Sequence, residues 1–191
     1  MARIAFKIQD LYSLDALNEK IDMILPIKNK TLETFLGFYF VCIIIKFMED
    51  KKQIAQNLFR QGYNCAQSVL GAFHEEINMT FEDALKLSSS FGGGMGRMRE
   101  VCGAVSSMFM IAGIKKGYIT PNDDAIKEKH YKLIQDLANQ FKEKYNTIIC
   151  RELLETNDNS PIPSKRTEKY YEERPCEEFI KTCAELITQN L

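Results

Sequence analysis

The sequence predicts an all-α protein, and three observations support this prediction. Apolar residues recur at the i, i+4, i+5 spacing of an amphipathic helix, as at Ile54, Leu58 and Phe59. Residues typical of helix starts and helix ends border the apolar segments. No segment shows the alternating pattern of a strand. We therefore expect one helical-bundle-like domain of about six helices with a glycine-rich loop, preceded by an N-terminal appendage.

The predicted helices begin just after residue 48. An amphipathic helix covers residues 49–61, and Asn64 is a typical N-cap for a second helix over residues 65–74. Thr80 and Asp83 resemble a capping box, which opens a third helix. These three short helices precede the segment that is richest in glycine.

A glycine-rich loop comes after the third helix and leads directly into Cys102. A loop is predicted because glycine in a helix or strand loses backbone entropy without a side chain to pack. An apolar run over residues 104–114, ended by two lysines and Gly117, then predicts a buried helix with a glycine C-cap. We expect the backbone to approach the cysteine site closely at Gly92, Gly93, Gly94, Gly96 and Gly103.

The C-terminal part of the chain is predicted to contain two more helices. The Thr-Pro pair at 120–121 predicts the start of a long, mostly polar helix that ends near residue 145. Residues 148–154 are expected to form a short helical turn. Residues 155–173 have the prolines and turn formers of a loop, and Pro175 opens the last helix.

Residues 1–47 differ in composition from the rest of the chain, so we divide the chain into an N-terminal extension, 1–47, and a four-cysteine domain, 48–191. Residues 35–47 are almost continuously apolar, but a membrane-spanning helix needs roughly 20 such residues, so no membrane span is expected. The stretch fits a buried strand, a peripheral helix or a signal-like segment. In a further interpretation, Met48 is the biological start and the extension is not native. Cys42 lies in the extension and is assigned no chemistry.

Charge and composition narrow the class of protein. The net charge is only -1, so no basic surplus indicates a nucleic-acid partner. The first residues lack the basic and then apolar layout of a signal peptide, and we expect a cytoplasmic protein. In that reducing compartment, several cysteines indicate a metal centre or redox chemistry before structural disulfides. Homo-oligomerisation is left open.

Three of the six cysteines occupy predicted first turns of helices. Cys65 comes after an N-cap, Cys102 after the glycine loop, and Cys176 after a proline. Unpaired N–H groups and the helix dipole favour a thiolate at such positions. Cys150 lies in the predicted short turn, and Cys183 is expected to be a core residue on an apolar face.

The spacing of the cysteines excludes several common sites. No Cys-x-x-Cys pair occurs, which argues against a zinc ribbon, a ferredoxin-type cluster motif and a thioredoxin-like dithiol. Both histidines lack the context of an activated base, so no catalytic residue is assigned and an enzymatic activity is left open. Any site must be assembled by the fold from separated positions.

Four segments carry a specific resemblance: GYNCAQSVL, FGGGMGRMREVCGAVSS, CRELL and PCEEFI, which contain Cys65, Cys102, Cys150 and Cys176. Through these segments the chain from about Met48 to its C-terminus resembles the C_GCAxxG_C_C family, which has a Cys-Gly-Ala-x-x-Gly motif and four invariant cysteines. The family's closing glycine is Ser107 here, a departure that concerns the local helix packing and not the four cysteines. The resemblance implies redox activity without a known substrate.

Three redox or metal functions are compatible with these four cysteines. Four thiolates are the ligand set of a [2Fe–2S] or [4Fe–4S] cluster, and we rank an iron–sulfur cluster for electron transfer first, with an unidentified redox partner protein. Thiol–disulfide chemistry without a metal ranks second, and a structural Zn(Cys)4 interaction module third. Arg97 and Arg99 flank the site in sequence and are expected to be solvated loop residues.

Overall fold

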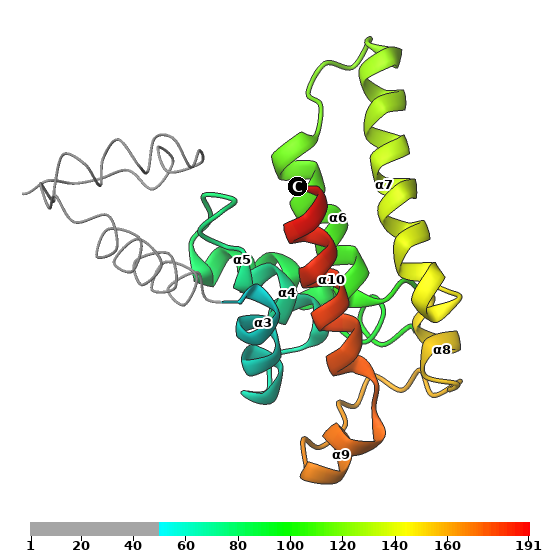
Figure 1. The fold of residues 1–191 in the computed structure, drawn as a ribbon. Coiled ribbons are helices and arrows are strands. Elements are labelled where there is room, and N and C mark those ends of the chain that lie inside the picture. Colours follow the sequence, from blue (N-terminus) through cyan, green and yellow to red (C-terminus); the bar gives the residue numbers. More distant parts are fainter. Residues whose placement is uncertain (1–49) are drawn as a thin grey trace, which may run out of the picture. The chain divides into compact units, whose positions relative to one another are not determined.

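A computed structural model describes residues 50–191, which contain helices and no β-strand (Figure 1). The prediction of an all-α fold is therefore confirmed. The predictions for residues 1–47, the apolar stretch 35–47 and Cys42 lie outside the described residues. Eight α-helices and one 3-10 turn occur in the described part: α3 (Lys51–Arg60), α4 (Cys65–Ala72), α5 (Phe81–Ser88), η2 (Ser89–Phe91), α6 (Gly103–Lys116), α7 (Asp124–Tyr145), α8 (Cys150–Leu153), α9 (Glu168–Glu173) and α10 (Cys176–Asn190).

The capping residues explain where the first helices begin. The Asn64 side chain accepts hydrogen bonds from the backbone N–H groups of Ala66 and Gln67, and the Gln67 side chain accepts one from the Asn64 backbone. The Thr80 hydroxyl accepts a hydrogen bond from the N–H of Asp83 at the start of α5. Both caps satisfy N–H groups that have no partner inside the helix. Asn64 thereby sets the position of Cys65, the first residue of α4.

Two predictions about where helices lie are wrong. Helix α7 begins at Asp124 rather than at the Thr-Pro pair 120–121, because the Asp123 side chain caps it by accepting a hydrogen bond from the N–H of Ile126. The segment predicted to be a loop contains α9, whose N-cap is Thr167. Helix α9, together with α8 in the predicted short turn, brings the described part of the chain to eight α-helices, whereas the prediction was about six.

The core lies between α3, α4, α6 and α10, which pack against one another. Helix α6 is buried along most of its length, as predicted from its apolar run, and it contacts both α4 and α10. The largest fully buried side chains come from all of these helices and from α7. They include Phe59, Phe73, Phe141, Leu70, Met108, Ile111, Leu137 and Ile180.

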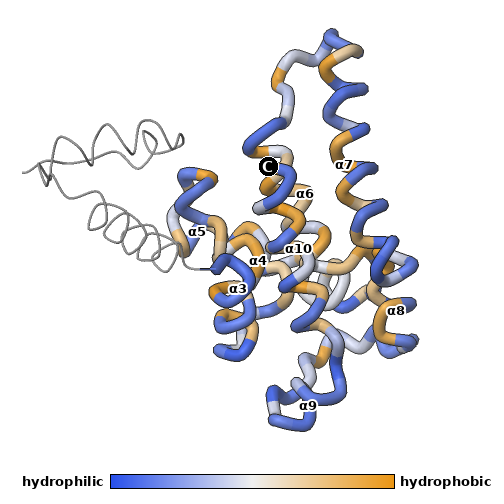
Figure 2. The backbone as a smooth tube through the Cα atoms, viewed as in Figure 1, coloured by the Kyte–Doolittle hydropathy of each residue, from blue (hydrophilic) through white to orange (hydrophobic). Residues whose placement is uncertain are grey.

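Helix α7 is the longest of the helices in residues 50–191 and runs beside α6 (Figure 1). Hydrophobic residues recur at intervals along it between hydrophilic ones (Figure 2). Its buried residues, Leu137, Ala138 and Phe141, lie in its C-terminal half, and α7 contacts both α6 and α10. Within residues 50–191, no helix combines the length and the apolar character that crossing a membrane requires.

Candidate functional site

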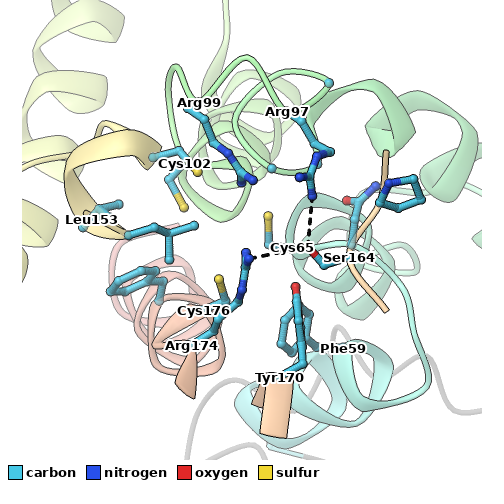
Figure 3. A pocket seen from close by; sticks show the side chains of 18 of the residues that line it. Phe59, Cys65, Arg97, Arg99, Cys102, Leu153, Ser164, Tyr170, Arg174 and Cys176 are labelled. Carbon is cyan, nitrogen blue, oxygen red and sulfur yellow. Dashed lines mark hydrogen bonds between the residues drawn. The ribbon is translucent and has the colours of Figure 1, made fainter. Parts of the chain in front are cut away.

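Four cysteines from separate parts of the chain line one cavity of about 300 Å³ (Figure 3). They are the four that the sequence singles out, Cys65, Cys102, Cys150 and Cys176. Cys102 and Cys150 are buried, and the other two are half-buried. Cys183 is fully buried in the core and does not line the cavity.

Each of the four cysteines stands at the start of a helix. Cys65, Cys150 and Cys176 are the first residues of α4, α8 and α10, and Cys102 is the N-cap residue of α6. The sequence predicted this placement for three of them and left Cys150 less clearly placed. The N-termini of four helices therefore meet at the cavity.

Backbone hydrogen bonds bring Cys102 and Cys150 together although they are far apart in sequence. The Cys102 N–H donates to the carbonyl of Ile148 at 2.8 Å, and the Cys150 N–H donates to the carbonyl of Glu100 at 2.6 Å. These bonds flank an isolated antiparallel bridge between Val101 and Ile149. The bridge fixes the end of the glycine loop against the start of α8.

Two of the predicted glycines are in close contact with cysteines. A Cβ atom on Gly103 would lie 2.7 Å from Cys65 Sγ and 2.6 Å from the carbonyl oxygen of Phe91. A Cβ atom on Gly94 would lie 2.7 Å from Cys150 Cβ, and its φ of +73° is in the left-handed region that glycine favours. The absence of a side chain at both positions thus lets the chain pass directly over the thiols. The other three, Gly92, Gly93 and Gly96, line the cavity.

Ser107, which replaces the family's closing glycine, fits into the contact between α6 and α4. It is fully buried, and its hydroxyl donates a hydrogen bond to the carbonyl of Ala66 at 2.8 Å. A buried hydroxyl with a partner does not carry the penalty of an unsatisfied polar group. The substitution therefore leaves the close packing beside Cys65 in place.

Burial disfavours the thiolate at three of these cysteines, and for Cys102 and Cys176 this differs from the prediction made from helix starts. Burial raises the pKa of Cys176 from 9.0 to about 12, and the neighbouring Cys65 and Cys150 contribute to this rise. Burial also raises the pKa of Cys102 well above its ordinary value, and the backbone amide of Val105 opposes this only in part. The pKa of Cys150 is raised as well, again mainly by burial. Desolvation therefore outweighs the helix N-termini.

An arginine beside the thiols is buried, contrary to the prediction that it is solvated. Arg99 is only 2% exposed, and its proximity lowers the pKa of Cys150, although burial and Cys65 keep that pKa raised. Arg99 Nε donates to the carbonyl of Asp158 at 2.7 Å. Its φ of +64° is uncommon for a residue with a side chain, and such backbone outliers concentrate at functional sites.

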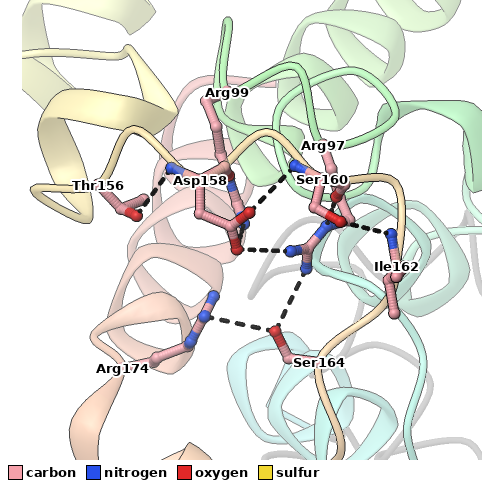
Figure 4. Close-up of polar contacts among 8 residues, drawn as sticks. All are labelled: Arg97, Arg99, Thr156, Asp158, Ser160, Ile162, Ser164 and Arg174. Carbon is pink, nitrogen blue, oxygen red and sulfur yellow. Dashed lines mark hydrogen bonds and ion pairs between the residues drawn. The ribbon is translucent and has the colours of Figure 1, made fainter.

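The segment predicted to be a loop covers the cavity and adds further arginines to it. Arg97 donates to the carboxylate of Asp158 at 2.9 Å and to the Ser164 hydroxyl at 3.2 Å, and so holds this segment against the glycine loop (Figure 4). Arg166 and Arg174 also line the cavity. Neither of these two was predicted from the sequence, because their contacts to the site come only from the folded path of residues 155–175.

The four sulfurs surround a space rather than a point. In residues 50–191, no group of three or more His, Cys, Asp or Glu side chains is close enough to hold a single metal ion. The cysteines, the glycine loop and the arginines instead enclose the cavity from several sides (Figure 3). The fold and site thus define an all-α protein with a four-cysteine cavity at helix N-termini.

Comparison with known proteins agrees with this description. Residues 63–190 match the family described as "Putative redox-active protein (C_GCAxxG_C_C)", and the chain belongs to that family. The predicted resemblance is therefore confirmed, and with it the redox-active class. No curated protein matches the chain, and no solved structure does.

Proposed function

We propose that Cys65, Cys102, Cys150 and Cys176 together hold an iron–sulfur cluster and that the protein transfers electrons to or from a partner protein. The observation that carries the proposal is that all four cysteines, each at the start of a different helix, line the same cavity. Four thiolates form the ligand set of [2Fe–2S] and [4Fe–4S] clusters. A bound cluster would accept and donate single electrons.

The size of the cavity fits a group larger than one ion. Its volume of 300 Å³ far exceeds the roughly 15 Å³ that one water molecule requires. The close contact of Gly103 with Cys65 Sγ keeps this sulfur at the wall of the cavity, where a side chain would displace it. The donor set and the available space therefore agree with a cluster.

The residues around the thiols would support a negatively charged group. The N–H groups at the first turn of a helix are potential donors to thiolate sulfur. Arg99 provides a buried positive charge beside Cys150. The apolar side chains of Leu153 and Phe179 line the cavity and limit the access of water. Together these groups would stabilise the deprotonated cysteines once iron replaces their protons.

The two alternative functions receive less support. Thiol–disulfide exchange requires a thiolate, but burial raises the pKa of Cys102, Cys150 and Cys176 and so disfavours the thiolate at these positions. A structural Zn(Cys)4 site requires four sulfurs around one point, and no such group occurs in the described part of the chain.

Anaerobic loading of the full chain with iron and sulfide tests the proposal. Iron and acid-labile sulfide should bind in equal amounts and give a visible charge-transfer absorbance. Replacing any one of the four cysteines with serine should weaken or abolish this absorbance. Cys183→Ser is the matched control and should load normally, because Cys183 is buried but does not line the cavity.

Two results would contradict the proposal. Stoichiometric zinc in a colourless protein would indicate the structural site. Iron uptake that is unchanged in the single Cys→Ser variants would show that the four sulfurs are not the ligands. Circular dichroism of each variant separates loss of the site from loss of the fold.

A further inference from the structure

The cavity also carries positive charge from Arg97, Arg99, Arg166 and Arg174, and we call this part of its lining the cationic side. Figure 3 shows Cys102 and Cys176 on one side and Arg97 on the other, with the ends of Arg99 and Arg174 between them. Four arginines line the cavity in all, and none of its described lining residues is acidic. A pocket with this surplus of guanidinium groups favours an anion.

Arg99 has a buried hydrogen-bond donor without a partner on this side of the cavity. Its Nη2 makes no hydrogen bond, and the nearest carboxylate oxygen, Asp158 Oδ2, is 3.9 Å away. A buried charged donor without a partner is unfavourable, so the position calls for an acceptor. Asp158 is 54% exposed at its side chain and pairs more closely with Arg97, at 2.9 Å.

Arg166 supplies a second buried donor without a partner, its Nη1. Its guanidinium lies over the rings of Phe59 and Tyr170, at 4.7 and 4.6 Å from their centroids. Arg166 Nη2 donates to the carbonyl of Tyr63 at 3.3 Å. The stacked rings and this hydrogen bond hold the guanidinium in one orientation before any ligand binds.

Arg174 completes the cationic side from the segment that leads into α10. Its guanidinium lies 4.8 Å from the ring centroid of Tyr170, and Nη2 is 3.5 Å from the hydroxyl of Ser164. Within residues 50–191, neither Arg174 nor Arg166 forms a salt bridge. Their charge is therefore available to a ligand in the cavity.

We propose that the cavity binds a small anion with a carboxylate or a tetrahedral oxyanion group, held by Arg99, Arg166 and Arg174 beside the cysteine sulfurs. Such oxygens match the planar fork of guanidinium donors. The proposal does not depend on the iron–sulfur cluster. If a cluster is present, the anion would bind next to it, and anions of this kind would be the class of small-molecule substrate.

Calorimetric titration of the full, reduced chain with inorganic phosphate, and separately with acetate, tests the proposal. The titrations are done before and after loading with iron and sulfide, at constant ionic strength. Saturable binding of one phosphate or acetate per chain is expected in both states. A preference for phosphate identifies a tetrahedral oxyanion as the ligand group, and a preference for acetate identifies a carboxylate.

Arg166→Gln should weaken the binding by about tenfold or more, because a charge-assisted hydrogen bond is lost. Arg99→Gln should weaken the binding to a similar extent. If that variant does not fold because Arg99 is buried, Arg166→Gln still tests the site, because Arg166 is only half-buried. The matched control is Arg60→Gln, a surface arginine that pairs with Glu177 and does not line the cavity. Its affinity should equal that of the unchanged chain.

Three results would overturn the anion site. They are the absence of saturable binding, equal weakening in Arg60→Gln, and binding that disappears once the cluster is loaded. The last result would mean that the arginines serve only to balance the charge of the cluster. The cluster proposal fails separately: a chain that binds the anion but takes up no iron would contradict the cluster and leave the anion site in place.

Discussion

Gly103 is the position where adding one methyl group should act most directly on the site. In Gly103→Ala, the new Cβ would lie 2.6 Å from the Phe91 carbonyl oxygen and 2.7 Å from Cys65 Sγ. Both distances are below van der Waals contact, and the first partner is backbone, which cannot rotate away. The chain must therefore shift at the start of α6 or displace the sulfur.

Gly113 provides a matched control in the same helix. A Cβ atom there would meet nothing within 4 Å. Gly113→Ala should stabilise the protein by roughly 0.5–1 kcal/mol, since alanine favours a helix more than glycine does. Gly103→Ala should instead destabilise it by about 1–3 kcal/mol, the usual cost of forcing an extra carbon into a packed interior.

Urea unfolding of both variants measures this difference, and iron uptake after anaerobic loading measures the effect on Cys65. We expect a lower urea midpoint and reduced iron content for Gly103→Ala, with a raised midpoint and normal iron content for Gly113→Ala. If both variants are stabilised alike, α6 does not press against Cys65 as the structure describes, and the steric reasoning fails.

Two further predictions concern pH and helix packing. Because the folded protein raises the pKa of Cys176 from 9.0 to about 12, its thiol contributes stability that is present below pH 9 and is lost as the pH rises toward 12. Urea midpoints of the metal-free chain should fall above pH 9, and fall less steeply in Cys176→Ser; parallel slopes would contradict the assigned pKa. Ser107→Gly should lower the free energy of unfolding by about 1–2 kcal/mol, because it removes the hydrogen bond to Ala66 and adds a flexible residue to α6. A thermal melt that matches the unchanged chain would show that this hydrogen bond adds nothing.

Local patterns predicted most of the helices and placed three of the four cysteines at helix starts. The apolar run before Gly117 identified α6, and Asn64 and Pro175 identified the starts of α4 and α10. These signals act within a few residues, through capping and through the burial of one helix face, so they are readable without a structure. The start of α7 was misplaced because Asp123 competes with Thr120 as a cap.

Non-local contacts decided the remainder of the site. Helix α9 has no strong pattern of its own, and its Tyr170 and Tyr171 are ordered by packing against Phe59 and Arg166. Arg99 is buried, and its Nε donates to the carbonyl of Asp158, 59 residues further along the chain. A charged side chain in a loop is solvated by default, and only such a partner reverses that expectation.

The sequence by itself determined that the protein is all-α, and it singled out Cys65, Cys102, Cys150 and Cys176 and the glycines expected beside them. The tertiary structure decided that these cysteines share one cavity, that burial raises the pKa of three of their thiols, and that four arginines line the same cavity. The physical reason is the range of the interactions. Helix starts and glycine conformations depend on neighbouring residues, whereas desolvation and charge balance depend on groups that only the folded chain brings together.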